Sequence, residues 1–192
     1  MKNDFRKISP KRSYDGPELK PYRKYKEFLR TDFNKRCGYS DCPEIWFGGK
    51  SNFHIDHFLP KSKHPQLECQ YSNLIYSCSF INIAKSDDEG QYLDPCEIDY
   101  NDHFERDELG NIIPKTESEQ AEYMIRKLKM YLKRYGIIWM LENLRDKISQ
   151  IDKVIKRTIE SESRHNLLQL SHELSIEFQK YLAYLEIDMD LD

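Results

Sequence analysis

Two adjacent residues, Asp56 and His57, are of the types that hydrolysis of a phosphodiester requires. Attack on phosphorus needs a base that takes a proton from water, and a neutral imidazole suits this task near pH 7. Negative charge then builds on the phosphoryl oxygens, and a hard divalent cation with oxygen ligands offsets it. On an extended segment the two side chains point to opposite sides, whereas a bend would bring both to one phosphate.

Two asparagines follow this pair at short intervals. Asn73 lies sixteen residues after His57, and Asn82 lies nine residues after Asn73. We expect Asn73 to hydrogen-bond backbone and so fix the loop that carries the base. Asn82 offers an amide oxygen to the same cation, on a short helix from about 82 to 87. His54, two residues before the carboxylate, is expected to have a structural role.

The elements that must position these residues fall into three stretches. Residues 1–36 are basic, and aromatic and apolar residues at helical spacing predict a helix from about Pro21 to Asn34. Residues 37–114 are rich in loops and hold the Asp56–His57 pair, on a short strand before a turn at Pro60. Residues 115–192 are expected to be helical.

Three helices are predicted in the C-terminal stretch. Thr116 and Glu119 match a capping box that begins the first of them, and Gly136 can end it. Apolar stripes continue from Ile137 to Ile159 and again from Leu167 to Leu185. Stripes of this kind favour packing within the chain, with docking of a partner helix as the alternative.

Charge is distributed unevenly, although the net charge is only −3. Residues 1–36 hold 12 basic against 5 acidic residues, and residues 37–114 hold 5 basic against 14 acidic residues. The basic segment could follow a phosphate backbone or pack on its own acidic neighbour, and charge alone favours neither. The acidic middle segment would repel a polyanion unless a metal or a partner neutralises part of it.

Composition limits the class of protein. Aromatic residues make up 12% of the chain, which favours a folded protein over a disordered one. Met1 to Arg12 is charged and lacks the apolar stretch of a signal peptide, and no run is long enough to span a bilayer. We therefore expect a cytoplasmic protein without a membrane partner, whose five cysteines are free thiols or metal ligands.

The spacing of these residues resembles the HNH endonuclease motif, whose fold is the ββα-metal finger. The pattern consists of Asp56-His57, then Asn73 followed by Leu, then Asn-x-x-Lys from Asn82 to Lys85. The resemblance implies that His57 is the general base and that Asp56 and Asn82 hold one Mg²⁺ or Mn²⁺. Asn73 would be the central, structural Asn of the catalytic motif. Asn at position 82 is a known variant, since many members have His there.

The resemblance extends to one bacterial HNH subfamily. Over roughly residues 37–147 the chain is similar to the nuclease subunit of Septu-type anti-phage defence (PtuB-like), which is also found with some retrons. The segments that carry it are H-I-D-H-F-L-P-K-S from His54, H-P-Q-L, Y-S-N-L-I-Y-S-C from Tyr71, Y-L-D-P-C-E-I-D-Y and G-N-I-I-P. This subfamily often has Glu where Asp56 stands, and its partner is an ABC-type ATPase. By position, Lys61 and Lys85 would be phosphate-binding cations.

Many HNH domains also carry a structural Zn²⁺ between two C-x-x-C pairs, and this chain departs from that pattern. Cys37 and Cys42 still have an acceptable spacing, but the partner of Cys78 is replaced by Ile81. Three thiolates leave a tetrahedral zinc one ligand short, and neither remaining cysteine lies at the family position. The sequence thus argues against a bound structural zinc, for which these three cysteines are the candidate ligands.

The sequence as a whole predicts an α+β protein with a ββα-metal core, an N-terminal basic helical segment and C-terminal helices. We expect a metal-dependent endonuclease that cuts DNA, with RNA as the alternative substrate, in anti-phage defence. The rival hypothesis is a non-catalytic subunit whose degenerate HNH finger binds nucleic acid or an ATPase. A further alternative is a nuclease that is active only in complex with its ATPase.

Overall fold

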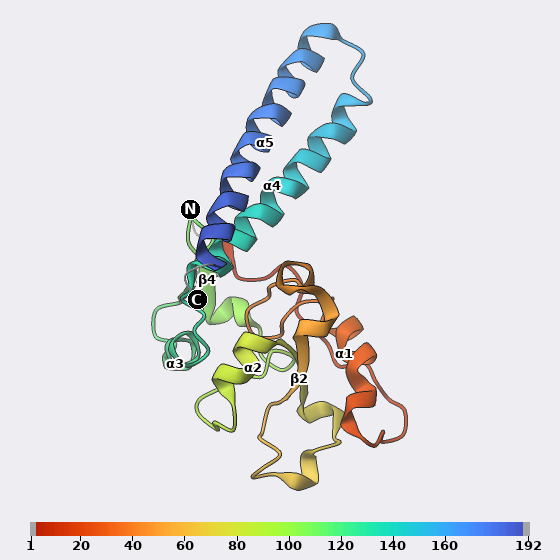
Figure 1. Ribbon diagram of the computed structural model, residues 1–192, viewed down its shortest axis with the longest axis vertical. Helices are drawn as coiled ribbons and strands as arrows, with labels where there is room; N and C mark the ends of the chain where they lie inside the picture. Colours follow the sequence, from red (N-terminus) through yellow and green to blue (C-terminus); the bar gives the residue numbers. More distant parts are fainter. Residues whose placement is uncertain (1–2, 190–192) are drawn as a thin grey trace. The chain divides into compact units, whose positions relative to one another are not determined.

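The structure is a computed structural model that describes residues 3–189, with side chains up to residue 186. The chain divides into two compact units, Met1–Glu108 with Ile112–Tyr131, and Leu109–Asn111 with Leu132–Asp192. Helices and small antiparallel sheets occur together, which confirms the α+β class (Figure 1). The helices and strands in chain order are β1 (Asn3–Asp4), α1 (Lys26–Asp32), β2 (Phe53–His57), β3 (Leu74–Cys78), α2 (Ser79–Lys85), β4 (Phe104–Arg106), β5 (Ile112–Pro114), α3 (Glu119–Lys127), α4 (Lys133–Ile155) and α5 (Ser161–Met189).

A two-stranded antiparallel sheet and the helix that follows it form the part of the first unit that holds the predicted site. Strands β2 and β3 pair from Phe53↔Cys78 to His57↔Leu74, without an interruption of the register. All residues of β3 are buried, and α2 begins directly after it and contacts both strands. The predicted strand before Pro60 and the predicted short helix around Asn82 are both confirmed, although the helix begins already at Ser79.

The helix predicted from Pro21 to Asn34 is also confirmed. It consists of a 3₁₀ turn, Tyr22–Tyr25, that continues into α1. Tyr25, Leu29 and Phe33 recur every fourth residue and are buried, and α1 packs against β2 and β3. This contact brings the N-terminal segment next to the Asp56–His57 strand.

The remaining sheet of the first unit has the strand order β1-β4-β5. Two arginines of the basic N-terminal segment, which follow β1 in the chain, pack within this unit. Arg6 is buried, donates to the carbonyl oxygen of Gly38 at 2.7 Å and lies 4.2 Å from the ring centroid of Tyr100. Arg12 forms an ion pair of 2.9 Å with Asp94. These two arginines pack on their own domain, which is one of the two alternatives that the sequence left open.

The first C-terminal helix differs from the prediction at both ends. Its N-cap is Ser118 rather than Thr116, because the Ser118 hydroxyl accepts the backbone N–H of Ala121. It ends at Lys127 rather than at Gly136. Lys129 adopts a left-handed conformation, with φ of 53°, and the backbone N–H of Met130 closes the end on the carbonyl of Ile125. A lysine in the position where glycine is usual gave no sequence signal for this end.

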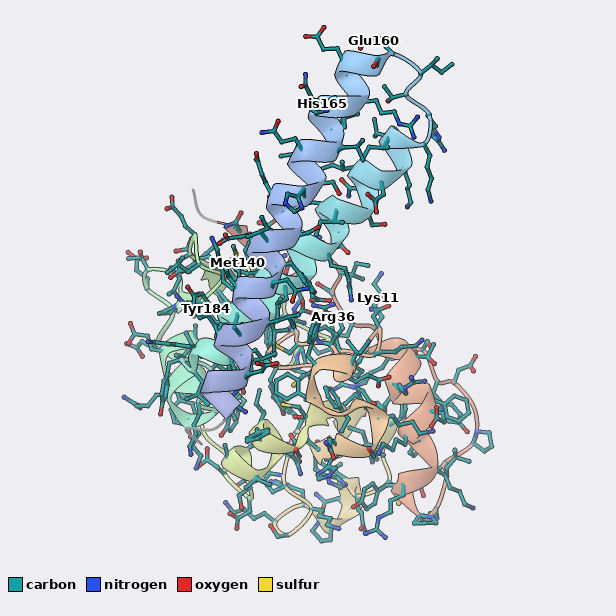
Figure 2. The ribbon with its side chains drawn as sticks, turned by 45° about the horizontal axis from the view of Figure 1, so that its top comes forward. Lys11, Arg36, Met140, Glu160, His165 and Tyr184 are labelled. Carbon is teal, nitrogen blue, oxygen red and sulfur yellow. The ribbon has the colours of Figure 1, made fainter. Side chains whose placement is uncertain are left out.

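The second unit is a long antiparallel hairpin of α4 and α5 (Figure 1). Glu160, labelled at the tip in Figure 2, accepts hydrogen bonds from the backbone N–H groups of Glu162 and Ser163 and so caps α5. The second predicted stripe was too long, because Ile159 lies outside α4 and is exposed. No helix in the described part of the chain is long and apolar enough to cross a bilayer.

Gly136 lies inside α4, where the prediction placed the end of a helix. A Cβ atom at this position would lie 2.9 Å from the carbonyl oxygen of Leu109 and 2.7 Å from Oδ1 of Asn111, both in the same unit. Glycine is therefore required here by the close approach of the Leu109–Asn111 segment. It is not needed for a positive φ.

Replacement of Gly136 by alanine tests this explanation. Alanine gains about 1 kcal/mol of helix propensity, but overpacking against a backbone carbonyl costs about 1–3 kcal/mol. We expect a net loss in the free energy of unfolding, measured by urea titration. Ser149→Ala, at an exposed position of the same helix, is the control and should be neutral or slightly stabilising. A stabilised Gly136→Ala protein would contradict the packing argument.

Candidate active site

Asp56 is held in the interior of the first unit, with 4% of its surface exposed. Its Oδ2 atom accepts a hydrogen bond of 2.7 Å from the hydroxyl of Tyr39 and lies 3.3 Å from the ammonium nitrogen of Lys85. Burial raises the pKa of Asp56, and the positive charge of Lys85 offsets only part of that effect. A second cation near this carboxylate would favour its ionised form further.

Lys85 does not lie where the sequence predicted it. It is fully buried on α2, and its ammonium donates a hydrogen bond of 2.8 Å to the backbone carbonyl of His57. The same ammonium lies 5.3 Å from the ring centroid of Tyr92. Its contacts with Asp56 and His57 join α2 to the end of β2. Lys85 is therefore not exposed to a phosphate as the sequence predicted, because its ammonium contacts Asp56 and the carbonyl of His57 in the interior.

Asn82 and Lys85 are three residues apart on α2 and face the same side of β2. Nδ2 of Asn82 lies 3.4 Å from Nδ1 of His54, and Lys85 contacts Asp56. His54 and Asp56 alternate by two along the strand and so share one face. The structure thus brings Asn82 to the same face of β2 as Asp56, next to His54 rather than in direct contact with the carboxylate.

Two oxygen atoms on this face have no hydrogen bond with any residue that the structure describes. Both contacts of Asp56 go to Oδ2, which leaves Oδ1 unbonded. Asn82 uses its amide nitrogen toward His54, which leaves its amide oxygen unbonded. A carboxylate and an amide oxygen are the donors that Mg²⁺ and Mn²⁺ prefer, so the chemistry of this pair fits a hard divalent cation.

His57 is oriented by a single backbone contact. Its Nε2 atom lies 3.0 Å from the carbonyl oxygen of Glu68, which can only accept, so Nε2 carries the proton of the neutral ring. Nδ1 then has a free lone pair and no hydrogen bond to a described residue. Burial, which leaves 8% of His57 exposed, lowers its pKa, although the Glu68 carbonyl and the Asp56 carboxylate act in the opposite direction. The ring is therefore neutral at pH 7, as a general base requires.

The side chains of Asp56 and His57 leave β2 on opposite sides, because the strand pairing continues regularly through both residues. Asp56 points toward α2, whereas the ring of His57 packs edge-on against Tyr22, with ring centroids 4.7 Å apart. The bend that would bring both groups to one side is not present in the strand. The two groups are nonetheless close enough for the charge of each to affect the pKa of the other.

Asn73 forms the backbone contacts that the sequence predicted. Its side chain accepts the N–H of Leu59 at 2.8 Å and donates to the carbonyl of the same residue at 3.0 Å. Its own carbonyl accepts the N–H of Phe58 at 2.8 Å. The buried amide thus fastens the segment that follows His57 to the start of β3. Its role in this arrangement is to hold the loop, and its side-chain hydrogen bonds to described residues go to backbone rather than to the ring of His57.

These residues give the first unit a neutral imidazole, a buried carboxylate and an amide on one strand and one helix. No protein-family model and no curated protein matches the chain. Chemically, the arrangement offers a base nitrogen on one side of β2 and two oxygen donors on the other. It therefore has the groups for proton transfer and for binding of a hard cation within one short segment.

The three cysteines considered for zinc lie together in the core of the first unit. Cys37, Cys42 and Cys78 are buried, and Sγ of Cys37 is 3.7 Å from the hydroxyl of Ser77. Burial opposes ionisation of Cys37, but hydrogen bonds from the side chains and backbones of Cys78 and Ser40 together outweigh it and lower the pKa of Cys37 to about 5. Ile81, in place of the fourth ligand, is fully buried. Among residues 3–186, no group of three or more His, Cys, Asp or Glu side chains is arranged to hold a metal ion.

Sequence reasoning missed two tyrosines of this site. Tyr39 hydrogen-bonds Asp56 and lies in the loop between α1 and β2, where nothing in the sequence distinguishes it from other aromatic residues. Tyr22 contacts His57 and lies within the helix predicted from Pro21 to Asn34, where its helical spacing gives no sign of this contact. Lys61 was predicted as a phosphate-binding cation and is half exposed, with its ammonium 4.9 Å from the Tyr22 ring centroid.

Proposed function

We propose that this protein is a metal-dependent nuclease whose β2, β3 and α2 form an HNH-type ββα-metal finger. The observation that carries the proposal is the state of His57. Its imidazole is neutral, one nitrogen is fixed by the carbonyl of Glu68, and the other has a free lone pair, one residue along the strand from a buried carboxylate. A histidine that served only the core would not need the unbonded nitrogen.

In this mechanism Nδ1 of His57 takes a proton from the attacking water. Asp56 and Asn82 would hold one Mg²⁺ or Mn²⁺ through the two oxygen atoms that have no other bond. When bound, the cation supplies charge that offsets the negative charge on the phosphoryl and leaving oxygens. Asn73 keeps the loop after His57 in place, and Lys61 is the exposed cation closest to the base along the chain.

The substrate and the biological setting rest on the resemblance described above. We propose DNA as the substrate, because most HNH relatives cut DNA, and RNA as the alternative. The same resemblance supports a role in bacterial anti-phage defence with an ABC-type ATPase as partner. The sequence has no pattern typical of a base-specific recognition element, so we expect weak sequence preference, or targeting supplied by a partner.

Metal removal tests the proposed function directly. Supercoiled plasmid DNA and a structured RNA are incubated with the protein in Mg²⁺, in Mn²⁺ and in EDTA. We expect cleavage of DNA with either metal and none with EDTA, because the oxygen donors bind the cation only weakly in competition with a chelator. Cleavage that continues at full rate in EDTA would exclude the proposed mechanism.

A second candidate function is favoured by one observation, the ion pair between Asp56 and Lys85. The ammonium already neutralises the carboxylate, as expected for a degenerate finger that binds nucleic acid or an ATPase without cutting. Calorimetric titration with Mn²⁺ separates the two functions. Binding that is lost in Asp56→Asn supports the nuclease, and no binding by the unaltered protein supports the binding subunit.

A third possibility is a nuclease that acts only in complex. It predicts that the purified chain binds Mn²⁺ through Asp56 but leaves plasmid DNA intact. Addition of the ABC-type ATPase that the resemblance implies as partner would then start cleavage. Metal binding in the absence of cleavage thus distinguishes this case from the non-catalytic subunit.

A further inference from the structure

Tyr22 connects the base of the candidate site to two cations. Its ring packs edge-on against His57, with centroids 4.7 Å apart and an angle of 71° between the planes. The ammonium of Lys61 lies 4.9 Å from the centroid of Tyr22, and the guanidinium of Arg23 lies 5.8 Å from it. These distances are within the range of cation–π attraction. Residues from two segments far apart in the sequence therefore meet on one tyrosine ring.

The two cations on this ring are weakly engaged with acidic residues. Lys61 has one carboxylate partner, Glu68 at 3.5 Å, and both side chains are half exposed. A pair of this kind stabilises a protein by about 0–1 kcal/mol, so a phosphate can replace the carboxylate at small cost. Arg23 is exposed and forms no ion pair with the residues that the structure describes.

Three other arginines of the N-terminal segment differ in this respect. Arg12 is paired with Asp94, Arg30 with Glu44, and Arg6 is buried. Each of these three side chains is therefore paired or enclosed within its own chain. Arg23, next to Tyr22, thus remains available for a partner outside the chain.

We propose that Tyr22, Arg23 and Lys61 form a phosphate-binding surface for the DNA strand that is cut, with Tyr22 holding both cations beside His57. The inference deepens the proposed function and depends on it, because it assigns the residues that bring the substrate to the base. The middle segment, with 5 basic and 14 acidic residues, would otherwise repel DNA from the site. Cations fixed on a ring lose less conformational freedom on binding than free side chains do.

Binding of DNA in the presence of EDTA tests the surface without cleavage. A fluorescein-labelled duplex of mixed sequence is titrated with the protein at several salt concentrations, and the slope of log K against log salt is measured. Each phosphate contact contributes about 0.9 to the magnitude of that slope for duplex DNA. We expect Arg23→Gln and Lys61→Gln each to reduce it by about one, and the double variant by about two.

Lys50→Gln is the matched control for Lys61→Gln. The Lys50 side chain is 53% exposed, close to the 48% of Lys61, but it pairs with Glu27 and does not lie over Tyr22. Its replacement should leave the salt slope unchanged. An equal reduction in Lys50→Gln would mean that binding depends on general charge, and it would overturn the proposed surface.

Two variants of Tyr22 distinguish the contribution of its ring to DNA binding from that of its hydroxyl. The hydroxyl makes no hydrogen bond with a described residue, so Tyr22→Phe is the conservative variant and should keep the salt slope that Tyr22→Leu loses. Tyr22→Leu removes the ring, and we expect a smaller salt slope together with a higher KM. If Tyr22→Leu lowers only the midpoint of thermal unfolding and keeps the slope, the assigned role of Tyr22 is wrong.

Failure of this inference is distinguishable from failure of the nuclease function. Metal-dependent cleavage with an unchanged salt slope in Arg23→Gln and Lys61→Gln would remove the surface and keep the nuclease. The same titration with an RNA duplex tests the alternative ligand. If the protein binds RNA more tightly than DNA and the same variants lose that binding, the proposed surface is correct but its ligand is RNA rather than DNA.

Discussion

We expect His57→Ala to reduce the rate of plasmid cleavage by about 10²- to 10⁴-fold, the usual contribution of a general base. The reason is that His57 has a neutral ring with one nitrogen fixed on the carbonyl of Glu68 and the other free. Alanine removes the proton acceptor and leaves Asp56, Asn73 and Asn82 in place. The measurement is the initial rate of conversion of supercoiled plasmid under saturating Mg²⁺.

His64→Ala is the control for this experiment. His64 lies in the same loop region but pairs with Glu89 on the surface, away from the Asp56 contacts. We expect it to retain the cleavage rate of the unaltered protein. Equal rates in the two histidine variants would show that His57 is not the base, and that the observed cleavage comes from another group or from a contaminant.

The second large effect is expected on stability, in Lys85→Met. Loss of the ammonium leaves the carboxylate of Asp56 buried without its ion-pair partner, and removal of one partner of a buried pair costs about 3–5 kcal/mol. Within the described part of the chain, Tyr39 would remain as the only hydrogen-bond donor to that carboxylate. The measurement is the free energy of unfolding from urea titration at pH 7.

A double variant and an exposed lysine provide the controls. Lys85→Met with Asp56→Asn removes both charges, so it should recover a large part of the loss. Lys61→Met breaks only the half-exposed pair with Glu68 and should cost less than about 1 kcal/mol. If the single Lys85→Met protein is as stable as the double variant, the ion pair does not contribute in the way argued here.

The loss in Lys85→Met should also depend on pH. Burial raises the pKa of Asp56, and without Lys85 that effect is unopposed by the nearest positive charge. A carboxyl group with a raised pKa in the folded state binds protons more tightly there than in the unfolded chain. Its ionisation therefore destabilises the fold above the unfolded value of about 3.9. Below that pH the part of the loss that comes from the Asp56 charge should vanish, whereas the part that comes from the lost hydrogen bond to the carbonyl of His57 should remain.

Local patterns in the sequence were sufficient for the elements around the site. The spacing of Tyr25, Leu29 and Phe33 predicts α1, and Pro60 marks the end of the strand that carries His57. The backbone contacts of Asn73 follow from an amide placed just before a buried apolar run. Each of these features depends on a short stretch of chain, and so it is visible in the sequence.

Features that depend on contacts between distant segments were not predictable. The spacing of Asn82 and Lys85 places both on one face of a helix, but only the packing of α2 on β2 decides that Lys85 points inward. Tyr22 meets His57 through the contact of α1 with the sheet, which no local pattern encodes. The prediction of a helix end at Gly136 is wrong, because the residues around Gly136 give no sign that the Leu109–Asn111 segment approaches it.

The buried ammonium of Lys85 has a consequence for folding in the absence of metal ions. Because Lys85 supplies a positive charge from within the chain, the buried carboxylate of Asp56 has an ion-pair partner even when no metal ion is bound. We therefore expect the first unit to fold without the proposed cation, in contrast to a zinc finger that is unfolded without its ion. On the proposed mechanism, chelation should abolish cleavage while the fold stays intact, and return of the cation should restore cleavage without refolding.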